Sequence, residues 1–179
     1  MYLYISGGVL ALVCVIGAAT DIVTGKIYNW LTFPAMLVGL ILAGVFTGWM
    51  GLLFSFLGIV LGCGLLILGF IWGGIGAGDI KMLMAVGALM GWFFVLFTFV
   101  YSVILAAVFA LILYIATGRI KYLFKNIKNF FAIVFYKRGQ DIPKVKMENS
   151  ISIRFGVFIA LGAIFHFIEV LSGWRLLKF

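Results

Sequence analysis

The chain alternates long apolar runs with short polar breaks. Six runs approach the ~20 residues that an apolar helix needs to cross a bilayer, and they cover residues 2–20, 31–47, 51–71, 80–91, 94–117 and 153–171. The fourth run is short for a full span. The breaks at 47–50 and 91–92 are so short that the helices on either side must pair as antiparallel hairpins. The pattern predicts an all-α, polytopic membrane bundle of about six transmembrane helices.

Composition supports the same fold class. Hydrophobic residues make up 66% of the 179 residues and charged residues 10%, whereas soluble domains are about half apolar and a quarter charged. We therefore expect a single integral membrane domain over residues 1–179. The first run lacks the basic residues that precede the apolar part of a signal peptide, so it is predicted to be the first transmembrane helix.

The basic residues predict the orientation of these helices. With the N-terminus outside, eleven Lys and Arg residues fall on the inner side and only Arg175 and Lys178 on the outer side. Such a bias is typical of cytoplasmic loops. The net charge of +8 is then a topological signal and an attraction to anionic membrane lipid, and it does not indicate nucleic-acid binding.

The one long polar segment, residues 118–152, is predicted to be a basic cytoplasmic loop. Its apolar residues recur at helical spacing from Ile120 to Val134, whereas Lys121, Lys125 and Lys128 fall on the opposite face. This pattern predicts an amphipathic helix in the lipid headgroups. Its role is either a lipid anchor or a docking surface for a partner.

Three of the five acidic residues have ordinary explanations. Asp141 and Glu148 lie in the basic loop, and Glu169 follows the only histidine, His166, by one helical turn. We interpret His166 and Glu169 as a local hydrogen-bonded pair. One histidine with one carboxylate offers too few ligands for a metal site.

Asp21 and Asp79 differ, because both fall at the membrane edge. Asp21 ends the first helix at the inner face and Asp79 begins the fourth at the same face, so the two lie at equal depth and can meet. Ionisable groups at membrane depth are functional candidates, although Asp21 alone could be an exposed charge at a helix end. Gly76 and Gly78, directly before Asp79, allow another backbone to approach closely, as a peptide substrate must.

Two adjacent carboxylates point to acid–base chemistry. They do not both ionise easily, so the pair holds one shared proton. The ionised member can take a proton from water while the protonated member donates to a peptide carbonyl; the titration belongs to the pair. This is aspartic proteolysis, which needs neither metal nor cofactor.

Two other functions stay open at this point. A small ion- or proton-coupled transporter would need further polar groups on a path outward, and the helices offer only Ser55, Thr98, Tyr101 and Ser102. A non-catalytic membrane scaffold would work through the basic helix.

Three segments resemble a known family. The stretches "TDIVTGKIYNWLTFP" (20–34) and "GAGDIKMLMAVGALMGW" (76–92) are similar to the two signature regions of the type IV prepilin leader peptidases, membrane aspartic endopeptidases of the G-x-G-D kind. "SIRFGVFIALGAI" (152–164) resembles their last helix. The chain looks like the small form without the N-terminal methylase region that serves tight-adherence (Flp-type) pili.

The resemblance implies a function and a site. Asp21 and Asp79 would be the catalytic pair of a bacterial inner-membrane enzyme with its catalytic face in the cytoplasm. The substrate would be a prepilin or pseudopilin precursor, cut between its short basic leader and its hydrophobic helix. Gly76, Gly78 and Lys81 would support the site.

The first signature region departs from the family pattern. Tyr28 stands where the family often has proline, and Ile22, Val23 and Thr24 stand where it often has arginine. Lys26 is a candidate to supply that charge.

Three polar residues around the signature regions have more than one interpretation. Asn29 and Thr32 are interpreted as caps of the second span, with Asn29 also a candidate supporting residue. Lys81 is either a positive-inside anchor or a charge that tunes the pKa of Asp79.

Overall fold

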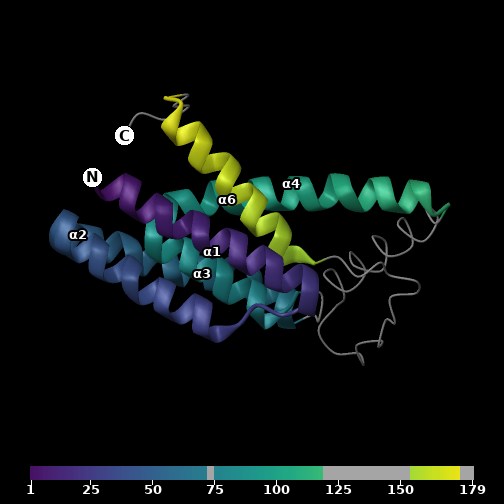
Figure 1. Cartoon of the computed structure of the whole chain (residues 1–179). Coiled ribbons are helices and arrows are strands. Elements are labelled where there is room, and N and C mark those ends of the chain that lie inside the picture. The colour runs from purple at the N-terminus through teal and green to yellow at the C-terminus, as the bar shows by residue number, and fades with distance from the viewer. Residues whose placement is uncertain (72–74, 119–153, 174–179) are drawn as a thin grey trace, which may run out of the picture. The chain divides into compact units, whose positions relative to one another are not determined.

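A computed structural model describes residues 1–71, 75–118 and 154–173, and every element in these ranges is an α-helix. In chain order the helices are α1 (Tyr2–Thr24), α2 (Asn29–Ile71), α3 (Ala77–Met90), α4 (Trp92–Ala116) and α6 (Phe155–Leu171) (Figure 1). The all-α class is thus confirmed for the described residues. The predicted amphipathic helix within 118–152 lies almost wholly outside them.

Three described helices, α1, α2 and α4, are long and apolar enough to cross a membrane. The helix α6 is apolar but shorter. At 1.5 Å per residue, the 43 residues of α2 would extend about 65 Å as one straight helix, roughly twice the thickness of the hydrocarbon core. Gly48 divides it, because its φ of 66° and ψ of −154° are not helical. The predicted spans 31–47 and 51–71 correspond to the two arms of α2, and the total of six spans stays a prediction.

The two arms of α2 pack against α3 in opposite directions. Along the first arm, the contacts advance from Asn29 against Lys81 to Gly39 against Ala88. Along the second arm they reverse, from Gly58 against Gly87 to Gly62 against Leu83. The break at Gly48 therefore closes an antiparallel hairpin, as the short polar break predicts.

Glycine allows this close packing. A Cβ at Gly39 would lie 2.5 Å from the carbonyl of Ala88, and one at Gly58 would lie 2.3 Å from the Gly87 oxygen. Only glycine lets the backbones approach so closely.

The helix α3 forms the centre of the core. Six of its side chains are fully buried: Met82, Leu83, Ala85, Val86, Ala88 and Leu89. Besides both arms of α2, α3 contacts α1 and α6, and α1 contacts α6 (Figure 1). The short α3 is therefore held on several sides, which fixes the position of its first turn.

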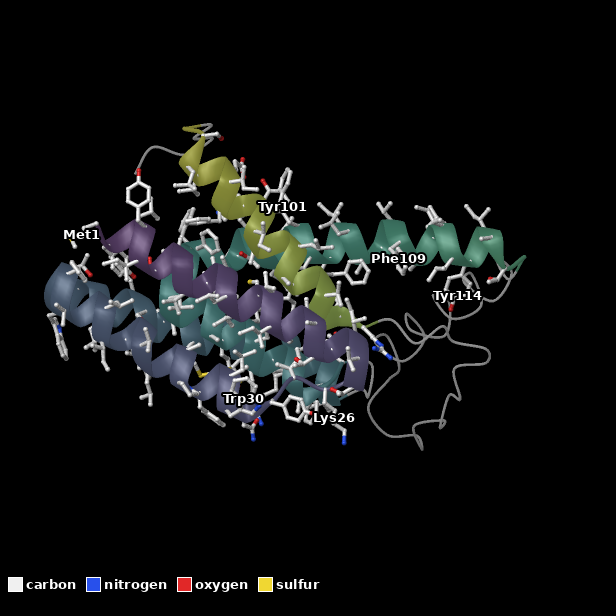
Figure 2. The ribbon with its side chains drawn as sticks, in the orientation of Figure 1. Met1, Lys26, Trp30, Tyr101, Phe109 and Tyr114 are labelled. Carbon is white, nitrogen blue, oxygen red and sulfur yellow. The ribbon has the colours of Figure 1, made fainter. Side chains whose placement is uncertain are left out.

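The order of contacts gives the direction of α1 and α6. Tyr2 at the start of α1 donates its hydroxyl to the Leu89 oxygen, and Gly17 near its end lies against Met82, so α1 runs antiparallel to α3. Gly7 of α1 lies against the ring of Phe167, toward the end of α6. The end of α1 thus lies beside the starts of α3 and α6, away from Met1 (Figure 2).

Contacts within the chain define two compact units, Met1–Leu105 with Arg154–Phe179, and Ala106–Ile153. The described part of the second unit is the remainder of α4 followed by a turn, in which Gly118 has a φ of 66°. All site residues described below belong to the first unit. The single domain over 1–179 stays a prediction.

Candidate active site

Asp21 lies in the last turn of α1. The helix ends at Thr24 because Gly25 adopts the left-handed conformation, with a φ of 66°, and its N–H donates to the Asp21 carbonyl at 2.9 Å. A glycine in this position is a common end of a helix. The Asp21 residue is only 5% exposed, which excludes the exposed helix-end charge considered from the sequence.

Asp79 lies in the first turn of α3. Its Oδ2 accepts a hydrogen bond at 3.1 Å from the N–H of Gly76, as the acid of a capping box does. The Gly76 backbone is extended at this point. The hydrogen bond that caps the start of α3 thus holds the Asp79 carboxylate next to the glycine-rich turn.

The environment of Asp79 disfavours its ionised form. Asp79 is 9% exposed and precedes the apolar stretch 80–91, outside the candidate spans. Desolvation, together with the nearby charge of Asp21, raises the pKa of Asp79 to about 6, against the opposing effect of the Gly76 and Gly156 amides. A buried carboxylate near another carboxylate is expected to shift in this direction.

The two carboxyl groups meet at Gly156, in the first turn of α6. A Cβ built on Gly156 would lie 2.8 Å from Asp21 Oδ2 and 3.1 Å from Asp79 Oδ1. The two oxygens are therefore no farther apart than the sum of these distances, about 6 Å, within the range in which one charge alters the ionisation of another. No hydrogen bond of acceptable geometry reaches Asp21 Oδ2 from any residue that the structure describes.

Arg154 connects the start of α6 to the end of α1. Its Nη1 donates to the carbonyl oxygens of Asp21, at 2.6 Å, and of Ile22. In the sequence, Arg154 counts among the inner-side positive charges, and Gly156 is one of 23 glycines. The pattern Arg-Phe-Gly at the start of the last apolar run is the one sequence signal that marks this place.

A cavity of about 380 Å³ opens beside the two carboxyl groups. It is formed by the turn between α1 and α2 and by the start of α3, and its lining residues are Asp21, Gly25, Lys26, Ile27, Tyr28, Asn29, Gly76, Ala77, Gly78, Asp79 and Lys81. The structure thus brings both aspartates and all five predicted supporting residues, Lys26, Asn29, Gly76, Gly78 and Lys81, to one cavity. Figure 2 shows Lys26 and Trp30 at this end of the helices and Met1 at the other.

Lys81 and Asn29 contact each other across the cavity wall. The Lys81 ammonium donates to Asn29 Oδ1 at 2.8 Å and lies over the ring of Phe33, 5.6 Å from its centroid. The groups that shift the pKa of Asp79 do not include Lys81, so the tuning role has no support. The capping role of Thr32 was wrong, because its buried hydroxyl has no hydrogen-bond partner among the described residues.

Polar groups away from the cavity have local partners. Glu169 Oε2 accepts from the Tyr101 hydroxyl at 2.9 Å and lies 3.0 Å from His166 Nδ1, so the predicted His166–Glu169 pair is confirmed. The hydroxyls of Ser55 and Ser102 donate to helix carbonyls and give no support to a polar path for a transporter. In the described ranges, no group of three or more His, Cys, Asp or Glu side chains is placed to hold a metal ion.

Comparison with known proteins identifies the family. Neither the curated proteins nor the solved structures contain a match to this chain. A family model, that of the type IV leader peptidase family, matches residues 8–111. This range includes Asp21, Asp79 and every residue that lines the cavity. Because the match extends over more than half of the chain and contains both converging carboxyl groups, the protein belongs to the type IV leader peptidase family and is a peptidase.

Proposed function

We propose that this peptidase is an aspartic endopeptidase with Asp21 and Asp79 as its catalytic dyad. The observation that carries the proposal is the approach of Asp21 Oδ2 and Asp79 Oδ1 to the same point beside Gly156, next to an accessible cavity. Asp21 Oδ2 is buried without a hydrogen-bond partner among the described residues, and an unpaired buried carboxylate oxygen is unfavourable. A proton shared with Asp79 would pair it.

The dyad would cleave a peptide bond through an activated water. The ionised carboxylate takes a proton from the water as its oxygen attacks the scissile carbonyl carbon, and the protonated carboxyl gives its proton to the carbonyl oxygen. The tetrahedral intermediate then collapses: the C–N bond breaks, the leaving nitrogen takes the proton that the dyad holds, and one hydroxyl of the intermediate returns its proton to the dyad as the carbonyl forms again. The pair titrates as a unit, so the roles of base and acid belong to the pair.

The substrate is a prepilin-like precursor, as membership of the family implies. We propose the Flp or tight-adherence type, whose short basic leader is removed just before the hydrophobic helix. The cavity contains two features that suit an extended peptide, the turn at Gly76 and Gly78 and the loop around Ile27. A Cβ at Gly78 would lie 3.0 Å from Ile27 Cβ, so a larger residue there would displace the loop that forms the opposite wall.

The proposed cleavage site faces the cytoplasm, with the N-terminus outside and the protein in the bacterial inner membrane. Lys26 and Lys81 both line the cavity, and basic residues favour the inner side. Met1 lies at the opposite end of α1 (Figure 2). The position of the basic residues thus supports an inner-face site.

The dyad is tested by co-expression with a candidate prepilin, reading the size of the precursor on a gel. Asp21→Asn and Asp79→Asn should each leave the precursor uncut while the variant accumulates in the membrane. Asp141→Asn, which removes an acid of the basic loop, is the matched control and should cleave normally. Cleavage that survives either change in the dyad refutes the proposal.

A further inference from the structure

The first turn of α6 contacts both proposed catalytic residues, although it lies outside the residues 8–111 that the family model matches. Gly156 lies between the two carboxyl groups, where any side chain would meet one of them. The Gly156 amide also opposes the rise in the pKa of Asp79. The start of α6 therefore lies close to both carboxyl groups.

Arg154 fixes the distance between this turn and α1. Its guanidinium donates to the carbonyls of Asp21 and Ile22, which lie at the end of α1, where helix carbonyls lack their usual partners. The backbone carbonyl of Asp21 is thus hydrogen-bonded to Arg154, which lies two positions before Gly156. Both hydrogen bonds come from Nη1, so one nitrogen of the guanidinium bridges two successive carbonyl groups.

We propose that Arg154 and Gly156 are positioning residues of the peptidase: Arg154 anchors α6 to the end of α1, and the missing side chain of Gly156 lets both carboxyl groups approach the same point of α6. This inference rests on the proposed dyad. It adds a third helix to the site, and it assigns the dyad's geometry to a glycine and to an arginine that do not themselves react.

The critical variant is Gly156→Ala. The added Cβ would lie within 3.1 Å of both carboxyl oxygens and 2.6 Å from Ile27 Cδ1, so the carboxyl groups or α6 must move. A displacement of about 1 Å in a catalytic site can reduce the rate about a hundredfold. Most of the cavity lining is unchanged, so the loss should appear in kcat, with KM altered by less than about threefold.

Two other glycines provide controls for the kinetic measurement. Gly162→Ala introduces a Cβ into the same helix, 2.6 Å from Ser102 Oγ, about 9 Å along the axis from Gly156. This variant should lose stability while the folded enzyme keeps its kcat. Gly64→Ala meets nothing within 4 Å and should resemble the wild type in both respects.

A second pair of variants tests the anchor. Arg154→Ala removes both hydrogen bonds to α1 and should lower kcat about tenfold or more, whereas Arg154→Lys keeps a charge and a donor and should recover part of the loss. The assay is steady-state cleavage of a candidate prepilin, over a range of precursor concentrations, by enzyme purified in detergent. The folded fraction is measured by thermal unfolding of the same samples.

The outcomes separate the inference from the proposed function. A low kcat for Gly156→Ala, with kcat retained in Gly162→Ala, supports the inference. A folded Gly156→Ala with the kcat of Gly64→Ala overturns it. If Gly156→Ala does not fold, the arginine pair decides: wild-type kcat in Arg154→Ala overturns the inference, and partial recovery by Arg154→Lys supports it. Activity in Asp21→Asn or Asp79→Asn would instead defeat the dyad itself.

Discussion

The buried carboxyl of Asp79 should reduce the stability of the folded protein at neutral pH, and removing its charge should restore that stability. The perturbation is Asp79→Asn. Asparagine has no charge to desolvate, and its side-chain oxygen can still accept the hydrogen bond that Gly76 N–H makes to Asp79 Oδ2 at 3.1 Å. The variant therefore removes the electrostatic penalty while it keeps the start of α3.

The magnitude follows from the pKa of Asp79, which rises from its ordinary 3.8 to about 6 in the folded protein. One pKa unit corresponds to about 1.4 kcal/mol, so the ionised Asp79 destabilises the folded state by about 3 kcal/mol. Because the folded state holds this proton more tightly than the unfolded state, the contribution of Asp79 to stability is most favourable below pH 3.8 and falls as the pH rises to about 6. Above about pH 6 the ionised Asp79 keeps the folded state less stable by the full amount of about 3 kcal/mol.

The assay is unfolding of the purified protein in detergent micelles, by heat or by sodium dodecyl sulfate, from about pH 4 to pH 8. The Asp79→Asn variant should be more stable than the wild type by up to about 3 kcal/mol near pH 7.5, and the two should converge near pH 4. Asp141→Asn, in the basic loop, controls for a general effect of lost negative charge. Equal stability of Asp79→Asn and wild type near pH 7.5, or a difference that does not change with pH, refutes the reasoning.

Three further predictions concern activity and packing. The kcat/KM of the wild-type peptidase should fall about tenfold per pH unit above about pH 6, because the dyad then loses its shared proton; a profile that is flat to pH 8 contradicts this. Gly58→Ala should greatly reduce the yield of folded protein in membranes, because the new Cβ would lie 2.3 Å from the Gly87 oxygen; a normal yield and melting temperature would show that α2 can move away from α3. Glu169→Gln should weaken the contacts to Tyr101 and His166 and lower stability by about 1–2 kcal/mol, yet leave prepilin cleavage intact; lost cleavage in a folded variant would show a role for this cluster in the reaction.

Apolar run length predicted most of the helices. The run 2–20 became α1, and the runs 31–47 and 51–71 became the two arms of α2, with the predicted break at Gly48. These predictions succeed because lipid imposes a minimum length on an apolar helix and glycine provides the turn. Helix ends were less predictable: α1 continues to Thr24, because Gly25, and not the last apolar residue, stops it.

The sequence also pointed to the two aspartates. Asp21 ends one apolar run and Asp79 begins another at the same predicted depth, and depth along a membrane helix can be counted from the sequence. Counting residues does not reveal which helices are neighbours, nor how closely two side chains approach. The capping role predicted for Thr32 failed at this level, because it depended on a hydrogen-bond partner that only packing selects.

The sequence by itself determined that the chain forms apolar helices and where Gly48 interrupts them, and it made Asp21 and Asp79 the candidates for a functional pair. Tertiary structure decided that both carboxyl groups meet at Gly156, that Arg154 joins α6 to the last carbonyls of α1, and that α3 is buried at the centre. The physical reason is that the length of an apolar run is a property of one continuous segment, so it can be read from the sequence. The absent side chain of Gly156 acts between helices, and among 23 glycines only the packing of the helices shows that this one lies between two acids.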